Sequence, residues 1–312
     1  MQLHILVTLF AMTFLNINFA REMKLEVKSR TELVDIPSAS GIEFYGNSFY
    51  IIGDNSAWLY QFDSSFKGFN KHRIHDNNTN DTIPKKEKPD FEASTVVTVD
   101  GRPQLYIFGS GSKSPMRDIL VKVDLSNPQN YQSVSLEKFY LKLRSAGISE
   151  LNIEGAVCAN ESIYLLNRAD NSIIRFACSA FENFLQSPGD DLKFTHHKFE
   201  LPVFENVQAA FSGASIIPAT STMIFTASLE QTNNWIDDGA ILGSYVGVVD
   251  LEQLSDTNTA QCILVSEHRN GMRVKIESVT VRAAGKNKIN LYMVTDSDGG
   301  NSELIEANLF LD

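Results

Sequence analysis

Five apolar segments of the chain begin in the same way, with a serine or glutamate set among small residues. They are ASGIEF around Ser40, DFEASTVV around Glu92, NIEGAV around Glu154, FSGASII around Ser212 and KIESVTV around Glu277. The steps between these residues are 52 (92−40), 62 (154−92), 58 (212−154) and 65 (277−212) positions. A period of about 60 residues indicates a repeat architecture and strongly limits the folds open to the chain.

Each of the five segments opens a group of short runs rich in Val, Ile, Phe and Tyr, separated by Gly, Asn, Asp and Pro. This pattern favours β-strands, and four strands per repeat form one blade of a propeller. The sequence therefore predicts an all-β fold, a five-bladed β-propeller. The fifth repeat is one strand short, so we expect KLEVKSRTEL (24–33) to supply its outer strand and close the ring.

Little helix is expected between the strands. In the second repeat SVSLEKFYL reads as the last strand, and RSAGISEL near Arg144 and FENFLQS near Phe181 read as single helical turns at most. The longest polar loop is DNNTNDTIPKKEKPD (76–90). Long loops on rigid scaffolds often carry function.

The first twenty residues differ from the rest of the chain, because they contain no Lys, Arg, Asp or Glu and are apolar from Ile5 to about Leu15. That run is too short to span a bilayer and is typical of a signal peptide. We expect residues 1–20 to be a signal peptide, residues 21–312 to form a single propeller domain, and the protein to be secreted or periplasmic. No other segment is long and apolar enough to predict a membrane span.

The net charge of −11 makes nucleic acid a poor partner and suits a protein that binds cations. The three cysteines, Cys158, Cys178 and Cys262, lack the spacing of metal ligands. Three buried thiols are the favoured interpretation, and one disulfide with a free thiol is the alternative.

In a propeller the first strand of each blade lines the central channel, so Ser40, Glu92, Glu154, Ser212 and Glu277 should converge on the axis. Three crowded carboxylates repel one another unless they share protons or a cation. Oxygen donors without His or Cys favour Ca²⁺. We therefore predict a calcium site here; the alternative is a set of separate, hydrated polar residues.

The order Ser, Glu, Glu, Ser, Glu resembles that of the calcium-activated apyrase (soluble nucleotidase) family. The resemblance covers roughly residues 36–310 and implies a five-bladed propeller with one calcium ion in its channel, held by the five residues above. The apyrases also carry acidic motifs in an N-terminal segment, which have no counterpart before Ser40. Nucleotidase activity is therefore not taken as the leading hypothesis. The chain is also similar to secreted bacterial propeller proteins of unknown function.

Loops between the second and third strands should form the mouth of the propeller. Lys113, Arg117 and Arg168 lie in these loops and could hold an anion, and Trp235 could stack on a ligand. The same loops carry acids, namely Asp54, Glu230, Asp237, Asp238, Asp296 and Asp298. The plainer interpretation is that turns are simply rich in polar residues.

Three functions remain open at this stage. The favoured one is a secreted calcium-binding propeller that holds a polar or anionic small molecule or glycan at its mouth. The second is a calcium-dependent phosphohydrolase of apyrase type, with Lys113, Arg117 and Arg168 on the phosphates and Asp54 as general base. The third is a protein-interaction scaffold with a structural metal. The sequence does not decide whether the protein is an enzyme, nor its oligomeric state.

Overall fold

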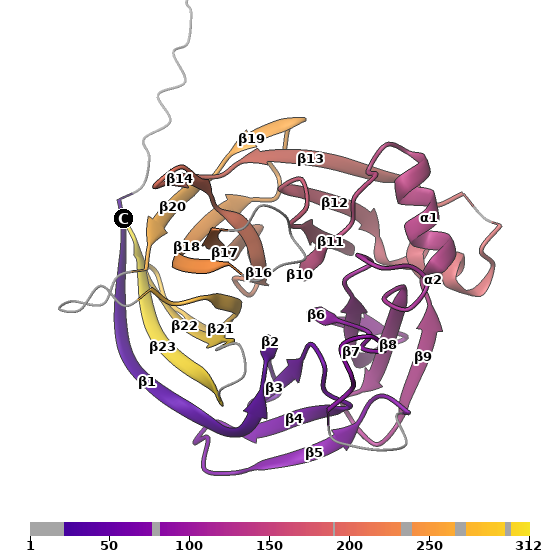
Figure 1. Cartoon of the computed structure of the whole chain (residues 1–312), viewed down its shortest axis with the longest axis horizontal. Coiled ribbons are helices and arrows are strands. Elements are labelled where there is room, and N and C mark those ends of the chain that lie inside the picture. Colours follow the sequence, from indigo (N-terminus) through magenta and orange to yellow (C-terminus); the bar gives the residue numbers. More distant parts are fainter. Residues whose placement is uncertain (1–21, 77–81, 190, 232–238, 266–272, 297–300) are drawn as a thin grey trace, which may run out of the picture.

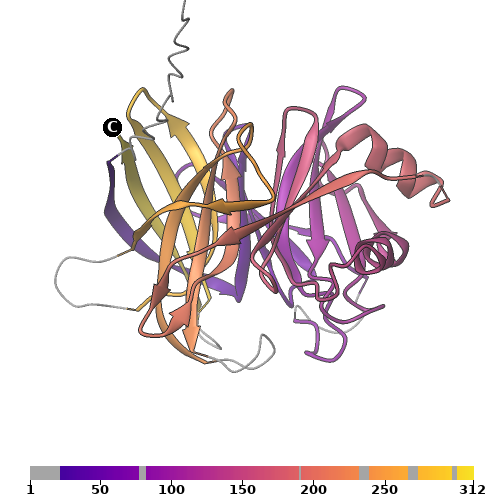
Figure 2. The same cartoon turned by 90° about the horizontal axis from the view of Figure 1, so that it is seen from above.

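The computed structural model describes residues 22–76, 82–189, 191–231, 239–265, 273–296 and 301–312. Five sheets surround a central opening, each with its first strand innermost (Figure 1). Seen from above, the strands run roughly along the axis of the ring (Figure 2). The predicted all-β, five-bladed propeller is confirmed.

Blades 1 to 4 contain four antiparallel strands each, ordered from the axis outward. Blade 1 consists of β2 (Ala39–Tyr45), β3 (Ser48–Gly53), β4 (Trp58–Asp63) and β5 (Phe69–Arg73). Blade 2 consists of β6 (Phe91–Val99), β7 (Arg102–Gly109), β8 (Ile119–Asp124) and β9 (Tyr131–Ser135). Blade 3 consists of β10 (Ile153–Ala159), β11 (Ser162–Asn167), β12 (Ser172–Ala177) and β13 (Phe194–Glu200). Blade 4 consists of β16 (Ala210–Ile216), β17 (Thr222–Gln231), β18 (Ala240–Asp250) and β20 (Gln261–Leu264).

Blade 5 is assembled from both ends of the described chain. Its inner strands are β21 (Ile276–Ala284), β22 (Lys288–Thr295) and β23 (Asn301–Leu311), and β1 (Met23–Pro37) lies outside β23 (Figure 1). The β1–β23 pairing is antiparallel and places Met23 opposite Leu311 and Leu33 opposite Ser302. The closing strand predicted over 24–33 is therefore present and longer than expected.

Two small elements were not predicted. Strand β19 (Thr257–Thr259), from the connection between β18 and β20, pairs in parallel with β13 and covers the outer edge of blade 3. A two-residue hairpin, β14 (Val203–Phe204) and β15 (Val207–Gln208), connects blades 3 and 4. Covering an edge strand removes a row of unpaired backbone groups.

The expectation of single helical turns was wrong. Helices α1 (Glu137–Ser145) and α2 (Cys178–Gln186) have nine residues each and lie at the outer edge of the ring (Figure 1). The strand expected over 133–141 ends at Ser135, and the helix begins two residues later. Tertiary packing decides this outcome, because the apolar side chains of both helices enter one buried cluster.

The hydrophobic core is a ring of five clusters, each between two neighbouring blades. The cluster between blades 2 and 3 also takes in both helices, through Phe139, Leu143 and Phe181. Every sheet thus has apolar side chains on both faces, which explains why its inner strands are almost continuously buried.

The three cysteines are free thiols and are half-buried rather than buried as expected. Over the described residues, no helix combines the length and apolarity needed to cross a membrane.

Candidate functional site

All five inner strands are interrupted at the same place. The register of each inner strand with its neighbour shifts across one residue, and in the five blades that residue is Ser40, Glu92, Glu154, Ser212 or Glu277. A β-bulge leaves its extra residue outside the ladder and redirects the side chain. The five residues therefore occupy equivalent positions around the axis.

The small residues beside the bulges let the inner strands approach closely. A Cβ on Gly155 would lie 3.1 Å from the carbonyl carbon of Gly213, and one on Gly213 would lie 2.5 Å from Cα of Ser278. The two bulge serines connect neighbouring blades. The hydroxyl of Ser40 donates a hydrogen bond to the carbonyl oxygen of Phe91 in blade 2. The hydroxyl of Ser212 donates to the carbonyl oxygen of Ile276 in blade 5, at 2.6 Å. The sequence pattern around each Ser or Glu thus reflects a narrow channel.

Three glutamates and two cations form a connected group around the axis. Lys275 Nζ lies 3.0 Å from Glu277 Oε1 and 3.7 Å from Glu230 Oε2. Arg168 Nη2 lies 3.0 Å from Glu230 Oε2, and Arg168 Nε lies 3.9 Å from Glu154 Oε1. We call these five residues together with Glu92 the axial cluster. Its four acids and two cations leave two formal negative charges.

Burial and the excess of acidic groups shift the pKa values of several side chains in the axial cluster. Burial raises the pKa of Glu154 to about 7, against the opposing effect of Arg168. Burial also raises the pKa of Glu92 well above its usual range, and the neighbouring carboxylates of Asp90 and Glu154 add to the shift. The negative charge of Glu277 raises the pKa of Lys275. Without a further cation, the surroundings favour protons on Glu92 and Glu154.

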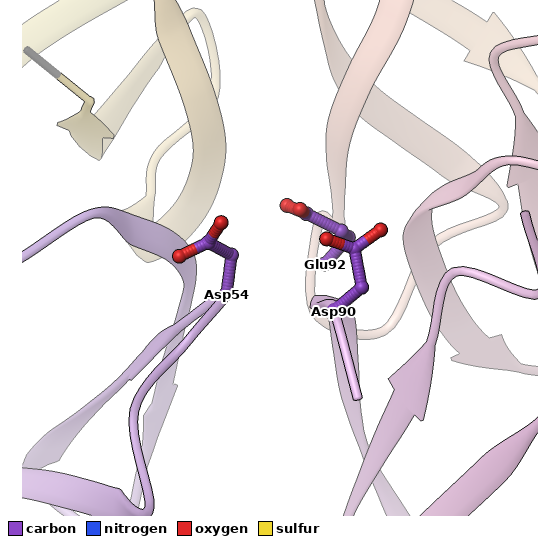
Figure 3. Close-up of side chains that lie close together, drawn as sticks. All are labelled: Asp54, Asp90 and Glu92. Carbon is purple, nitrogen blue, oxygen red and sulfur yellow. The ribbon is translucent and has the colours of Figure 1, made fainter. Parts of the chain in front are cut away.

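A second group lies beside the first. Lys88 contacts Asp54 and lies 2.7 Å from Asp90 Oδ1, and Arg117 contacts the other oxygen of Asp90. We call these four residues the lateral cluster; its formal charges cancel. The carboxylates of Asp54, Asp90 and Glu92 face a common gap (Figure 3), with one oxygen of each within 4.8 Å of the others. Among the described residues they are the one group of three acids this close; Glu92, Glu154 and Glu277 do not form such a group.

Both clusters line a cavity of about 820 Å³. Among its lining residues are seven acids and seven cations, with Ile83 and Pro84 as the apolar contribution. Three of the cations, Lys85, Lys86 and Lys113, are exposed and form what we call the rim. The cavity is therefore acidic at the axis and basic at its entrance.

The predicted mouth residues divide into two groups. Asp54, Lys113, Arg117 and Arg168 line the cavity, as do Glu230 and Asp296. Arg117 and Arg168 are paired with acids rather than left free for an anion. Trp235, Asp237, Asp238 and Asp298 lie outside the described residues.

Several lining residues escaped the sequence analysis although a signal was present. Asp90, Asn152 and Lys275 each stand two positions before a bulge glutamate, immediately before the inner strand begins, so the repeat itself marks these positions. Asn152 Nδ2 donates to Glu154 Oε1 at 2.7 Å. Lys88 carried no such signal, since its contact with Asp54 spans 34 residues and depends on the path of a loop.

The fold and the site together define a five-bladed propeller with a charged cavity at one end of its channel. The chain belongs to the family described as "Family of unknown function (DUF6929)", whose model matches residues 35–309. The five-bladed propeller that the resemblance to the apyrases implied is thus present. The family to which the chain belongs, however, is DUF6929 and not the apyrase family. Comparison with curated protein sequences gave no match.

Solved structures with a similar fold have very different sequences. Glutaminyl cyclase of Myxococcus xanthus aligns over 92% of this chain and 97% of its own, with 11% identity and a TM-score of 0.48. A protein of unknown function from Bacteroides thetaiotaomicron VPI-5482 aligns over 92% and 76%, with 8% identity and a TM-score of 0.47. A member of the DUF4221 family from Bacteroides vulgatus aligns over 89% and 79%, with 9% identity and a TM-score of 0.40.

Proposed function

We propose that the protein is an exported binding propeller that holds a divalent cation, Ca²⁺, at the axial cluster and a polar, anionic small molecule or glycan above it. The observation that carries this proposal is the distribution of charge in the cavity. With all four acids ionised, the axial cluster has two uncompensated negative charges, which one divalent cation would neutralise, and the exposed rim is basic. An anionic group would thus meet a cation below and lysines at the entrance.

The donor atoms at the axis are compatible with calcium. Ca²⁺ prefers six to eight oxygen ligands from carboxylates, other oxygens and water. Glu92, Glu154 and Glu277 supply carboxylates, and in the described structure Glu154 and Glu277 use only Oε1 in the contacts above. The hydroxyls of Ser40 and Ser212 donate their protons to backbone carbonyls, which leaves oxygen lone pairs able to accept.

The lateral cluster is the less suitable place for the cation. The ammonium of Lys88 already bridges Asp54 and Asp90. Although burial opposes the charged form of Lys88, the carboxylates of Glu92, Asp90 and Asp54 raise its pKa. A metal ion at this point would have to displace a tightly held cation.

A phosphohydrolase has weaker support than a binding protein. Its proposed base, Asp54, is paired with Lys88. Two of its three proposed phosphate ligands, Arg117 and Arg168, are engaged by acids. Lys113 alone among the three is exposed at the rim. A purely structural metal in a protein-interaction scaffold would account for the axial cluster but leaves the basic rim without a role.

Calorimetric titration of Ca²⁺ into chelator-treated protein tests the cation. We expect one ion per chain, and at least tenfold weaker binding for Glu154→Gln, which removes a charge from the axial cluster. Glu150→Gln is the matched control, because Glu150 is exposed and lies outside the cavity lining. Equal calcium binding by wild type and Glu154→Gln would overturn the axial assignment.

The anion is tested with inorganic phosphate and glucuronate as probes, each with and without Ca²⁺. Binding that requires Ca²⁺ and weakens in Lys113→Ala, while Ca²⁺ affinity is unchanged, supports the proposed arrangement. Release of phosphate from a nucleoside diphosphate only when Ca²⁺ is present would instead favour the hydrolase. Calcium binding with no response to either probe would favour the scaffold.

A further inference from the structure

Two of the three thiols lie next to each other. Cys158, on β10, and Cys178, the first residue of α2, have their Sγ atoms 3.5 Å apart. A disulfide bond needs about 2.05 Å, so about 1.5 Å separates the present contact from a covalent link. Small rotations of the two side chains can cover a displacement of that size. The spacing in the sequence, twenty residues apart, gave no indication of this contact.

The backbone holds the two cysteines in register. Cys158 is opposite Ile163 in the β10–β11 ladder, and Ser162 is opposite Ala177 in the β11–β12 ladder. The backbone N–H of Cys178 donates to the carbonyl of Glu161 at 2.9 Å. Both positions are thus fixed by one sheet, and the approach of the thiols is a consequence of blade geometry rather than of a loose loop.

Neither cysteine is fully buried. Both are half-buried, and both side chains pack at the edge of the cluster between blades 2 and 3. The hydrogen bond between them lowers the pKa of Cys158 and raises that of Cys178. Since the thiolate is the nucleophile in exchange reactions, this contact favours attack by Cys158.

We propose that Cys158 and Cys178 are a disulfide-forming pair, oxidised by thiol–disulfide exchange with a disulfide-bearing oxidant such as glutathione disulfide or a dithiol oxidase. One cysteine thiolate attacks a sulfur of the oxidant, forming a mixed disulfide and releasing one oxidant thiol. The second cysteine thiolate attacks the protein sulfur of that mixed disulfide and releases the other thiol. Two electrons and two protons pass to the oxidant, and the chain gains one S–S bond.

The third cysteine provides an internal contrast. Cys262, on β20, belongs to the cluster between blades 3 and 4, and its thiol contacts the carbonyl of Ala260 at 3.6 Å. Burial raises the pKa of Cys262 to about 12, which disfavours the thiolate. The proposal therefore predicts one disulfide and one remaining thiol.

The disulfide would fasten α2 to the inner strand of blade 3. It closes a short loop that contains β11 and β12, and a link of this kind stabilises a protein chiefly by restricting the unfolded chain. We expect the oxidised protein to melt about 5 °C above the reduced protein.

The test uses the full chain equilibrated with excess glutathione disulfide or with a reducing agent, then unfolded in the presence of N-ethylmaleimide. Intact mass should show one maleimide on the oxidised wild type and three on the reduced protein. Peptide mapping should place the link between Cys158 and Cys178. Cys262→Ser should form the same link and carry no maleimide when oxidised, whereas Cys178→Ser should form no link within the chain.

The wild-type count and peptide map together decide the matter if a variant fails to fold. Three maleimides on wild type after equilibration with excess glutathione disulfide would overturn the proposal, as would a link that includes Cys262 or joins two chains. A melting temperature that rises on oxidation in wild type and not in Cys178→Ser would support it further.

Discussion

At the scale of single residues, the bulge in each inner strand explains a sequence pattern with two parts. The Ser or Glu is the extra residue of the bulge, and it leaves the ladder. The small residue after it lets the next blade approach, as Gly155 does beside Gly213. A residue that leaves the ladder and a residue whose minimal side chain lets the blades approach thus stand at adjacent positions.

Gly213→Ala should destabilise the propeller. An added Cβ would lie 2.5 Å from Cα of Ser278 and 2.7 Å from the carbonyl oxygen of Glu277, and both are backbone atoms. Overpacking of this kind costs about 1–3 kcal/mol, or a fall in melting temperature of roughly 2–6 °C. The control is Gly68→Ala, because a Cβ at exposed Gly68 would meet nothing within 4 Å. Thermal unfolding of the two variants should therefore differ, and equal melting temperatures would refute the close packing of inner strands.

At the scale of elements, helix α1 shows how a local pattern can be misread. The segment SVSLEKFYL contains β-type residues, yet Leu136, Phe139, Tyr140 and Leu143 recur at helical spacing. All four are buried, while Leu141 on the opposite face is 60% exposed. The helix is stabilised by its apolar face against blades 2 and 3, which a reading of strand propensity alone does not detect.

Two leucines in α1 allow that account to be tested within one helix. Leu143→Ala should lower the free energy of unfolding by about 2–5 kcal/mol, because it leaves a cavity in the cluster between blades 2 and 3. Leu141→Ala should change it by no more than about 0.5 kcal/mol. Both substitutions replace leucine by alanine in the same helix and so change helix propensity equally. A difference between their free energies of unfolding, measured by chemical denaturation, therefore reports the effect of burial. A similar loss in both variants would contradict the packing described for α1.

At the scale of the whole molecule, the sequence predicted what repeats and, apart from the closing strand β1, missed what occurs once. The blades and the five axial positions follow from a pattern present in every repeat. Strand β19 occurs once and has the sequence TNT, which carries no apolar pattern. The pairing of Lys88 with Asp54 and of Arg168 with Glu230 joins distant segments, and the choice of partner depends on loop geometry. The charge balance of the cavity therefore required the structure.

Closure of the ring by β1 leads to a prediction about the molecule as a unit. Strand β1 covers the full length of β23, buries Leu33 and Ile36, and places Arg30 against Glu303. A chain that begins at Val34 would expose the backbone groups of β23 and the apolar cluster between blades 4 and 5. We expect it to unfold at a much lower temperature and to aggregate, compared with a chain that begins at Glu22.

Rescue in trans distinguishes lost closure from a general defect. A synthetic peptide of residues 22–33 should restore the melting temperature of the shortened chain, because strand addition uses backbone hydrogen bonds along the β23 edge. A peptide with Leu33→Asp should fail, since Leu33 is 4% exposed and packs between blades 5 and 1. If the shortened chain melted within a few degrees of the longer one, the outer strand would be an addition to a ring already closed by contacts between inner strands.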